Sequence, residues 1–275
     1  MLTNLTNNQI LIGVIQASIA AILSLGVITF AKTKQIDILK DSLIALLRSI
    51  IQIVLISLVL IFVFTGPLIL AIPILAAMMY AAGTIAGRRA KGIPHAKTIT
   101  FKAVAFGSGL VIITMTLLGV IEWDLKSIIP VGSMIIANSM NTSALSLERF
   151  KSQVLNHTGE IESGLALGAS PNIVIRPHIR SAISAALIPR IDSLRSLGIV
   201  WIPGIMTGMI LSGSDPIYAG IYQFVIMAMI FSSSALASIM AVTFIKKYVF
   251  SEFDQLIFKP GNNQKKSSSP QKNSA

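Results

Sequence analysis

Long uncharged stretches alternate with short charged ones along most of this chain. Residues 1–31 carry no charge, and the uncharged stretch 49–87 is about twice as long as the roughly 20 residues that a helix needs to cross a bilayer. Gly66 and Pro67 interrupt the second stretch, so it predicts two spans joined by a tight turn. The whole pattern predicts an all-α, polytopic membrane protein with about seven transmembrane helices. The expected spans are 10–31, 43–64, 68–87, 103–121, 128–147, 196–214 and 217–245.

The composition agrees with a membrane protein, because 53% of the 275 residues are hydrophobic and only 12% are charged. The first apolar stretch has no basic residues before it and is too long for the core of a cleavable signal, so we expect it to be retained as a span. The chain contains no cysteine, which excludes both a disulfide framework and a thiolate metal site.

The net charge of +11 would suggest a nucleic-acid partner in a soluble protein, but here the positions of the basic residues decide. All but one of the 22 lysines and arginines lie on the same side of the membrane when the expected spans are counted, and Lys126 is the exception. Basic residues gather in cytoplasmic segments of membrane proteins. The pattern therefore predicts an external N-terminus, a cytoplasmic C-terminus and no nucleic-acid partner. We expect the protein in the plasma (inner) membrane of a prokaryote.

The connection between the fifth and sixth spans, about residues 148–195, is the longest one and reads as two cytoplasmic helices. Gly168 suits the end of the first helix, whereas Ser170 and Pro171 suit the start of the second. Pro177 and Pro189 are expected to kink or break the second helix. Apolar residues recur along it at every fourth position, namely Ile175, Ile179, Ile183 and Leu187.

Two interpretations of this helix pair stay open on the residues alone. It is either an amphipathic connector that lies on the membrane or a docking element for a soluble partner. Arg176 and Arg180 occupy a row beside the apolar one, where they would face lipid headgroups or that partner. Physical considerations favour the connector, because such amphipathic segments are common at membrane surfaces.

A resemblance to a known class of membrane proteins favours docking instead. The segment "ESGLALGAS", from Glu162 to Ser170, resembles the "EAA" signature of ABC-transporter permeases, whose glycine-containing turn docks on an ATP-binding subunit. The resemblance implies an ATPase-coupling role for Glu162, Leu165, Gly168, Ala169 and Ser170, with Arg176 and Arg180 beside them.

Two longer segments extend the resemblance to one particular family of ABC permeases. The segments "PVGSMIIANSMN" (130–141) and "ALIPRIDSLRSLGIVWIPGIMTGMILSGSDP" (186–216) look like the FetB family of iron-export ABC permeases, which is related to plant aluminium-sensitivity permeases. The similarity covers roughly residues 10–250. It implies a homodimeric permease in the lipid bilayer that exports iron or another metal cation. A separate P-loop ATPase subunit would bind ATP and Mg²⁺, and this chain would bind no cofactor.

The residue types in the chain indicate a membrane subunit that has no energy source of its own. None of the 11 acidic residues lies in the middle of an expected span, which argues against a carrier driven by protons or sodium. The chain has no phosphate-binding loop and no catalytic motif, so we expect it not to be an enzyme and to receive its energy from a partner. Two alternatives stay open, an ABC permease for a non-metal solute and an ATP-independent channel or facilitator.

The fifth span is the most polar and supplies the candidate translocation path. Met134, Asn138 and Asn141 share one helical face, and Thr142 lies beside them. These groups either contact a cation or hold neighbouring helices together. Met206 and Met209 are thioether candidates for the same path, although methionine also fills irregular cores. No set of metal ligands can be assigned.

The chain thus divides into a transmembrane permease domain, residues 1–258, and a polar tail, residues 259–275, that we expect to be disordered. Residues 246–258 mix aromatic, aliphatic and charged side chains, and we expect them to continue the last span as an interfacial helix.

Overall fold

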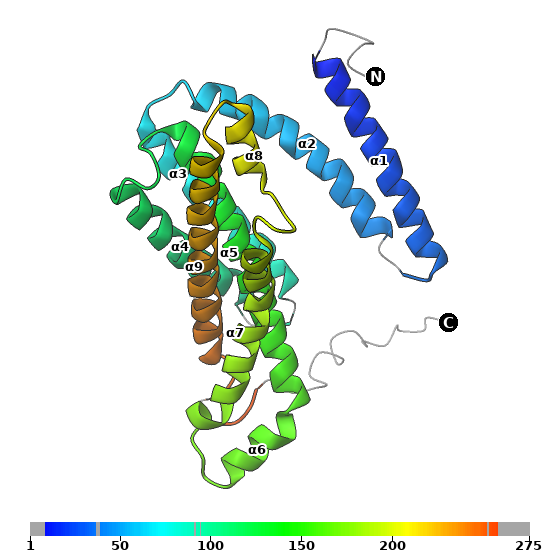
Figure 1. The fold of residues 1–275 in the computed structure, drawn as a ribbon. Helices are drawn as coiled ribbons and strands as arrows, with labels where there is room; N and C mark the ends of the chain where they lie inside the picture. Colours follow the sequence, from blue (N-terminus) through cyan, green and yellow to red (C-terminus); the bar gives the residue numbers. More distant parts are fainter. Residues whose placement is uncertain (1–8, 37–38, 91, 94, 252, 258–275) are drawn as a thin grey trace, which may run out of the picture. The chain divides into compact units, whose positions relative to one another are not determined.

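The structure is a computed structural model that describes residues 9–36, 39–90, 92–93, 95–251 and 253–257. These residues are almost entirely helical and contain no β-strand, only two isolated β-bridges. The all-α prediction is therefore confirmed. The helices are α1 (Gln9–Thr33), α2 (Leu39–Val63), the short 3₁₀ helix η2 (Leu68–Leu70), α3 (Ala71–Arg89), α4 (Ala96–Leu117), α5 (Leu125–Asn156), α6 (Thr158–Ala166), α7 (Pro171–Ser196), α8 (Gly204–Leu211) and α9 (Pro216–Lys246) (Figure 1).

Five helical segments of the described residues are long and apolar enough to cross a membrane, which confirms a multi-pass membrane protein. They correspond to the first four predicted spans and the seventh: Leu11–Thr33, Leu39–Val63, Leu68–Arg89, Ala96–Leu117 and Pro216–Lys246. The fifth predicted span, 128–147, is helical but forms only the middle of α5, whose 32 residues extend well past it.

The sixth predicted span, 196–214, is not a continuous helix, and this prediction was wrong. Helix α7 ends at Ser196, and α8 has only eight residues, a length of about 12 Å. Gly198 between them adopts a left-handed backbone with φ +76° and donates its N–H to the Trp201 carbonyl at 3.0 Å. Gly198 follows the end of α7 and Pro203 is the N-cap of α8, so no regular helix connects the two, although the segment is as apolar as a span.

The structure corrects two further expectations. Helix α7 does not break at Pro177 or Pro189, because it packs along both α5 and α9 and this packing keeps its backbone helical. The last span ends at Lys246, and the described residues after it are not helical. Instead, Phe250 pairs with Leu256 in an antiparallel bridge. The tail expected at 259–275 lies outside the described residues.

The chain forms two compact units, Met1–Gly66 and Pro67–Ala275. In the first, α1 and α2 pack on each other as a helical hairpin whose apolar side chains are mostly exposed, as expected of helices that face lipid. In the second unit α5 and α9 pack on each other, and α3, α4 and α7 surround them.

Small residues bring the helices of the second unit close together. A Cβ on Gly107 of α4 would lie 2.7 Å from the Ala237 nitrogen of α9, so this position allows no side chain. The Thr100 hydroxyl of α4 donates to the Gly83 carbonyl of α3 at 2.6 Å. Close packing of this kind, with polar groups bonded across helices, is typical of membrane interiors.

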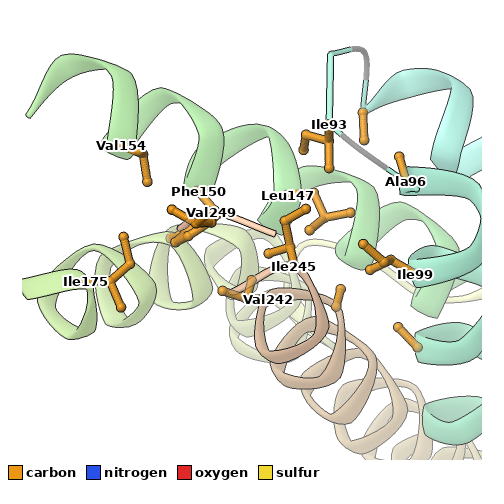
Figure 2. Packing of buried hydrophobic residues seen from close by; sticks show 14 of the residues in the cluster. Ile93, Ala96, Ile99, Leu147, Phe150, Val154, Ile175, Val242, Ile245 and Val249 are labelled. Atoms are coloured by element: carbon orange, nitrogen blue, oxygen red, sulfur yellow. The ribbon is translucent and has the colours of Figure 1, made fainter. Parts of the chain in front are cut away.

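One buried apolar cluster, here called the end cluster, joins residues of α5, α6, α7 and α9 to the start of α4 and the segment before it (Figure 2). In α5 it includes Leu147, at the end of the predicted span, and Phe150 and Val154 beyond that end. Ile175 of α7 and Ile245 of α9 pack against them, and both are almost fully buried. The cluster fixes the α6–α7 segment to the end of a membrane-spanning helix.

We predict that Phe150→Ala destabilises the protein by about 3–5 kcal/mol, because a side chain that is 2% exposed leaves a cavity in the end cluster. Thermal unfolding of the detergent-solubilised protein, followed by circular dichroism, should show a clearly lower midpoint. Phe253→Ala is the matched control, since Phe253 is 84% exposed and should leave the midpoint unchanged. Equal midpoints for the two variants would contradict a supporting role of the cluster.

Candidate functional site

The turn between α6 and α7 has the predicted form. Gly168 adopts φ +87°, a conformation that favours glycine, and donates its N–H to the Leu165 carbonyl at 3.0 Å. Ser170 is the N-cap of α7, and its carbonyl accepts from the Ile173 amide at 2.9 Å. The helices approach closely at Gly164, where a Cβ would lie 2.7 Å from a Val174 methyl group. The left-handed Gly168, the backbone hydrogen bonds and the close approach at Gly164 therefore determine the conformation of the turn.

A groove of about 790 Å³, here called the turn groove, opens beside this turn. All five residues of the predicted coupling segment line it: Glu162, Leu165, Gly168, Ala169 and Ser170. Pro171 continues the same side, and a segment from the other end of the chain, Phe253, Asp254, Gln255 and Leu256, lines the groove as well. This second segment was missed from the sequence, because its mixed apolar and polar residues look like an amphipathic helix.

Large apolar side chains are exposed around the turn groove. Leu167 in the turn is 88% exposed, and Phe253 in the groove is 84% exposed. The groove itself carries the carboxyl groups of Glu162 and Asp254. An apolar patch with polar groups beside it is the usual composition of a surface that binds another protein.

Arg176 and Arg180 do not line the turn groove. They line a separate pocket of about 600 Å³ on α7, together with Lys246 at the end of α9. The structure therefore divides the seven predicted coupling residues into a groove set of five and a basic pair in another pocket.

Two histidines meet behind the turn, with ring centroids 5.0 Å apart: His157 before α6 and His178 on α7. His178 is buried. Burial lowers the pKa of His178, the neighbouring His157 lowers this pKa further, and Glu160 acts in the opposite direction.

We predict that stability falls with acidification through the ordinary histidine range. The unfolded chain binds a proton at His178 near pH 6.5, whereas the folded chain binds it only at lower pH, so stability is full above pH 6.5 and declines below it. The unfolding midpoint measured between pH 7.5 and 5.5 should fall less steeply in His178→Gln. His95→Gln, at an exposed histidine, is the control. Parallel pH curves for wild type and His178→Gln would show that His178 does not cause the loss of stability at low pH.

The polar face of α5 carries four of the predicted path residues on successive turns. The Asn138 amide donates to the Met134 carbonyl at 2.7 Å, and the Thr142 hydroxyl donates to the Asn138 carbonyl at 2.9 Å. Asn141 is exposed, whereas Thr142 is buried. The path residues Met206 and Met209 lie on α8, which packs on α9, and the Met206 amide donates to the Gln223 side chain at 3.3 Å.

Two arginines from other helices bind this face. The Asn138 side-chain oxygen accepts from Arg190 of α7, and the Asn141 side-chain oxygen accepts from Arg89 of α3 at 3.2 Å. The Arg89 guanidinium also lies 3.9 Å from the Glu148 carboxylate. The sequence had placed Arg190 in the connection between spans, and no local signal linked it to Asn138, 52 residues earlier.

The described residues contain no group of three or more His, Cys, Asp or Glu residues that could hold a metal ion. The polar face of α5 carries amide, hydroxyl and thioether groups, with the guanidinium groups of Arg89 and Arg190 beside them.

Comparison with known proteins identifies the family of this chain. The model of the family described as uncharacterised protein family UPF0014 matches residues 14–250. The chain belongs to the UPF0014 family. No solved structure matches it.

The relatives of this family member come from bacteria and plants. The "Probable iron export permease protein FetB" of Escherichia coli K12 is 29% identical over 92% of this chain and 96% of its own length. "UPF0014 membrane protein YjkA" of Bacillus subtilis is 31% identical over 87% of this chain and 96% of its own length. "Protein ALUMINUM SENSITIVE 3" of Arabidopsis thaliana is 27% identical over 82% and 84%. The resemblance to FetB-type and plant aluminium-sensitivity proteins is thus confirmed.

Proposed function

We propose that this chain is the membrane-spanning permease subunit of an ABC transporter, and that the turn groove receives a separate ATP-binding subunit. The observation that carries the proposal is the convergence of all five signature residues on one groove with exposed apolar residues around it. The family relationship to a protein named as an iron export permease supports the same role.

The end cluster supplies the mechanical connection in this proposal. Force applied to the α6–α7 turn reaches α5 and α9 through Ile175, Phe150 and Ile245, which are packed together without exposed surface. Closely packed helices move as rigid bodies, so α5, α7 and α9 would shift together when the ATPase subunits close. Two copies of the chain would form the translocation path between them.

The chemistry is divided between the two subunits. ATP and Mg²⁺ bind and react in the ATPase, whereas this chain contributes the path and binds no cofactor. The distribution of basic residues supports a cytoplasmic position for the turn groove and the C-terminus, in the plasma (inner) membrane of a prokaryote.

The cargo we propose is iron or another metal cation moving out of the cell, as the name of the Escherichia coli relative suggests. A hard cation prefers carboxylate ligands, yet the polar face of α5 offers asparagine oxygens with Arg89 and Arg190 bound to them. Because two guanidinium groups repel a bare cation, we propose that the metal crosses with anionic ligands attached. An ABC permease for a non-metal solute and an ATP-independent channel are the alternatives.

We predict that Glu162→Lys abolishes co-purification of the ATPase. The tagged chain is expressed with its genomic neighbours, and the amount of P-loop ATPase per permease is measured after purification. Reversing the charge of a groove residue places a cation where a carboxylate lay, which should weaken docking by tenfold or more. Glu160→Lys makes the same charge change in α6 outside the groove and should retain the ATPase.

The controls separate the candidate functions. Equal ATPase recovery with both lysine variants would contradict the turn groove as the docking site. Absence of an ATPase from the wild-type preparation would favour the channel or facilitator.

We predict that Arg190→Gln lowers metal efflux about tenfold without affecting ATPase co-purification, because it removes the charge bound to Asn138 but leaves the turn groove intact. Efflux is measured as the loss of cell iron by mass spectrometry after expression of both subunits. Arg195→Gln is the control, since Arg195 is exposed and pairs with the neighbouring Asp192 instead of the polar face of α5. Unchanged efflux in Arg190→Gln would contradict the assignment of the polar face of α5 to the translocation path.

A further inference from the structure

The pocket that contains Arg176 and Arg180 has the composition of an anion site. It measures about 600 Å³ and is lined by Asn172, Ile173, Arg176, Pro177, Ile179, Arg180 and Lys246. Three of these residues are positively charged and none is acidic. Like charges gathered around one pocket repel each other, and a bound anion would remove that repulsion.

The charges have no carboxylate partner in the described part of the chain. Arg89 pairs with Glu148 and Arg195 pairs with Asp192, whereas Arg176, Arg180 and Lys246 form no ion pair with another described residue. Arg176 and Arg180 are also exposed. Their donor groups are therefore available to a ligand from outside the chain.

The pocket lies at a membrane boundary. Lys246 is the last residue of α9, which is one of the candidate spans, and Arg176 and Arg180 share a pocket with it. Lysine and arginine at the end of a span lie among lipid headgroups. This position holds whichever side of the membrane the C-terminus occupies.

Apolar residues share the pocket with the charges. Ile173, Pro177 and Ile179 line it together with the guanidinium groups, and Ile173 is 66% exposed. Ile173, Arg176, Pro177 and Arg180 follow one another at helical spacing on one face of α7. A lipid presents the matching combination, a phosphate next to hydrocarbon, whereas free phosphate offers no apolar part.

We propose that this pocket binds the phosphate headgroup of an anionic phospholipid, with Arg176, Arg180 and Lys246 on the phosphate and the apolar residues on the first part of the acyl chains. Basic pockets between helices at the membrane surface recognise anionic lipids in this way. The site is separate from the turn groove, and the inference does not depend on the proposed ABC function. A lipid bound in this pocket holds the end of α7 that contains Arg176 and Arg180 against the membrane.

The test compares two variants that lose the same amount of charge. In the first, Arg176, Arg180 and Lys246 are replaced by glutamine, which removes the pocket charges. In the control, the exposed Arg149, Arg195 and Lys247 are replaced by glutamine. Both proteins are purified at full length in detergent, checked for an unchanged unfolding midpoint, and titrated with phosphatidylglycerol or phosphatidylcholine under native mass spectrometry.

We expect wild type and control to bind phosphatidylglycerol in preference to phosphatidylcholine with affinities within twofold of each other. In the pocket variant, the ratio of the affinity for phosphatidylglycerol to the affinity for phosphatidylcholine should fall at least tenfold. If the triple variant does not fold, Arg180→Gln alone should weaken phosphatidylglycerol binding several-fold. A wild type without preference, or a control that loses as much as the pocket variant, would overturn the proposal.

Two further arms distinguish the other possible occupants. Inorganic phosphate at 10 mM should not displace phosphatidylglycerol, and displacement would identify a site for free phosphate. ATPase co-purification should be the same for the pocket variant and wild type. Loss of the ATPase with unchanged lipid binding would make the pocket part of the protein interface and overturn the lipid assignment.

Discussion

The end cluster is the interaction on which the rest of the second unit depends. Helix α5 continues past the end of its predicted span, and its apolar residues Phe150 and Val154 lie in this extension next to Leu147. They are covered by Ile175 of α7 and Ile245 of α9. Burying this apolar surface fixes the α6–α7 turn in a defined position.

The turn groove follows from this arrangement. Val249 and Leu256 also belong to the end cluster, so the chain after α9 is held beside the start of α7 rather than left free. The bridge between Phe250 and Leu256 then presents Phe253 and Asp254 to the groove. One apolar cluster thus organises two segments that are about 90 residues apart and together form the candidate docking surface.

The polar face of α5 illustrates a different constraint. Asn138 and Asn141 need hydrogen-bond partners in an apolar surrounding, and they obtain them from arginines on α7 and α3. Those arginines change the electrostatic character of the face. The amide groups stay neutral, but in the folded protein they lie beside the guanidinium groups of Arg89 and Arg190, and the Glu148 carboxylate lies near Arg89.

The sequence by itself determined the features that depend on local chemistry. Uncharged runs of sufficient length identified five helical spans, and the requirement of Gly168 for a left-handed backbone located the turn to within a residue. Tertiary structure decided the rest. Packing on α5 and α9 kept α7 helical through two prolines, whereas the apolar 196–214 segment contains only a short helix. The Arg190–Asn138 contact and the second side of the turn groove join residues far apart in the chain, and local periodicity carries no information about such pairs.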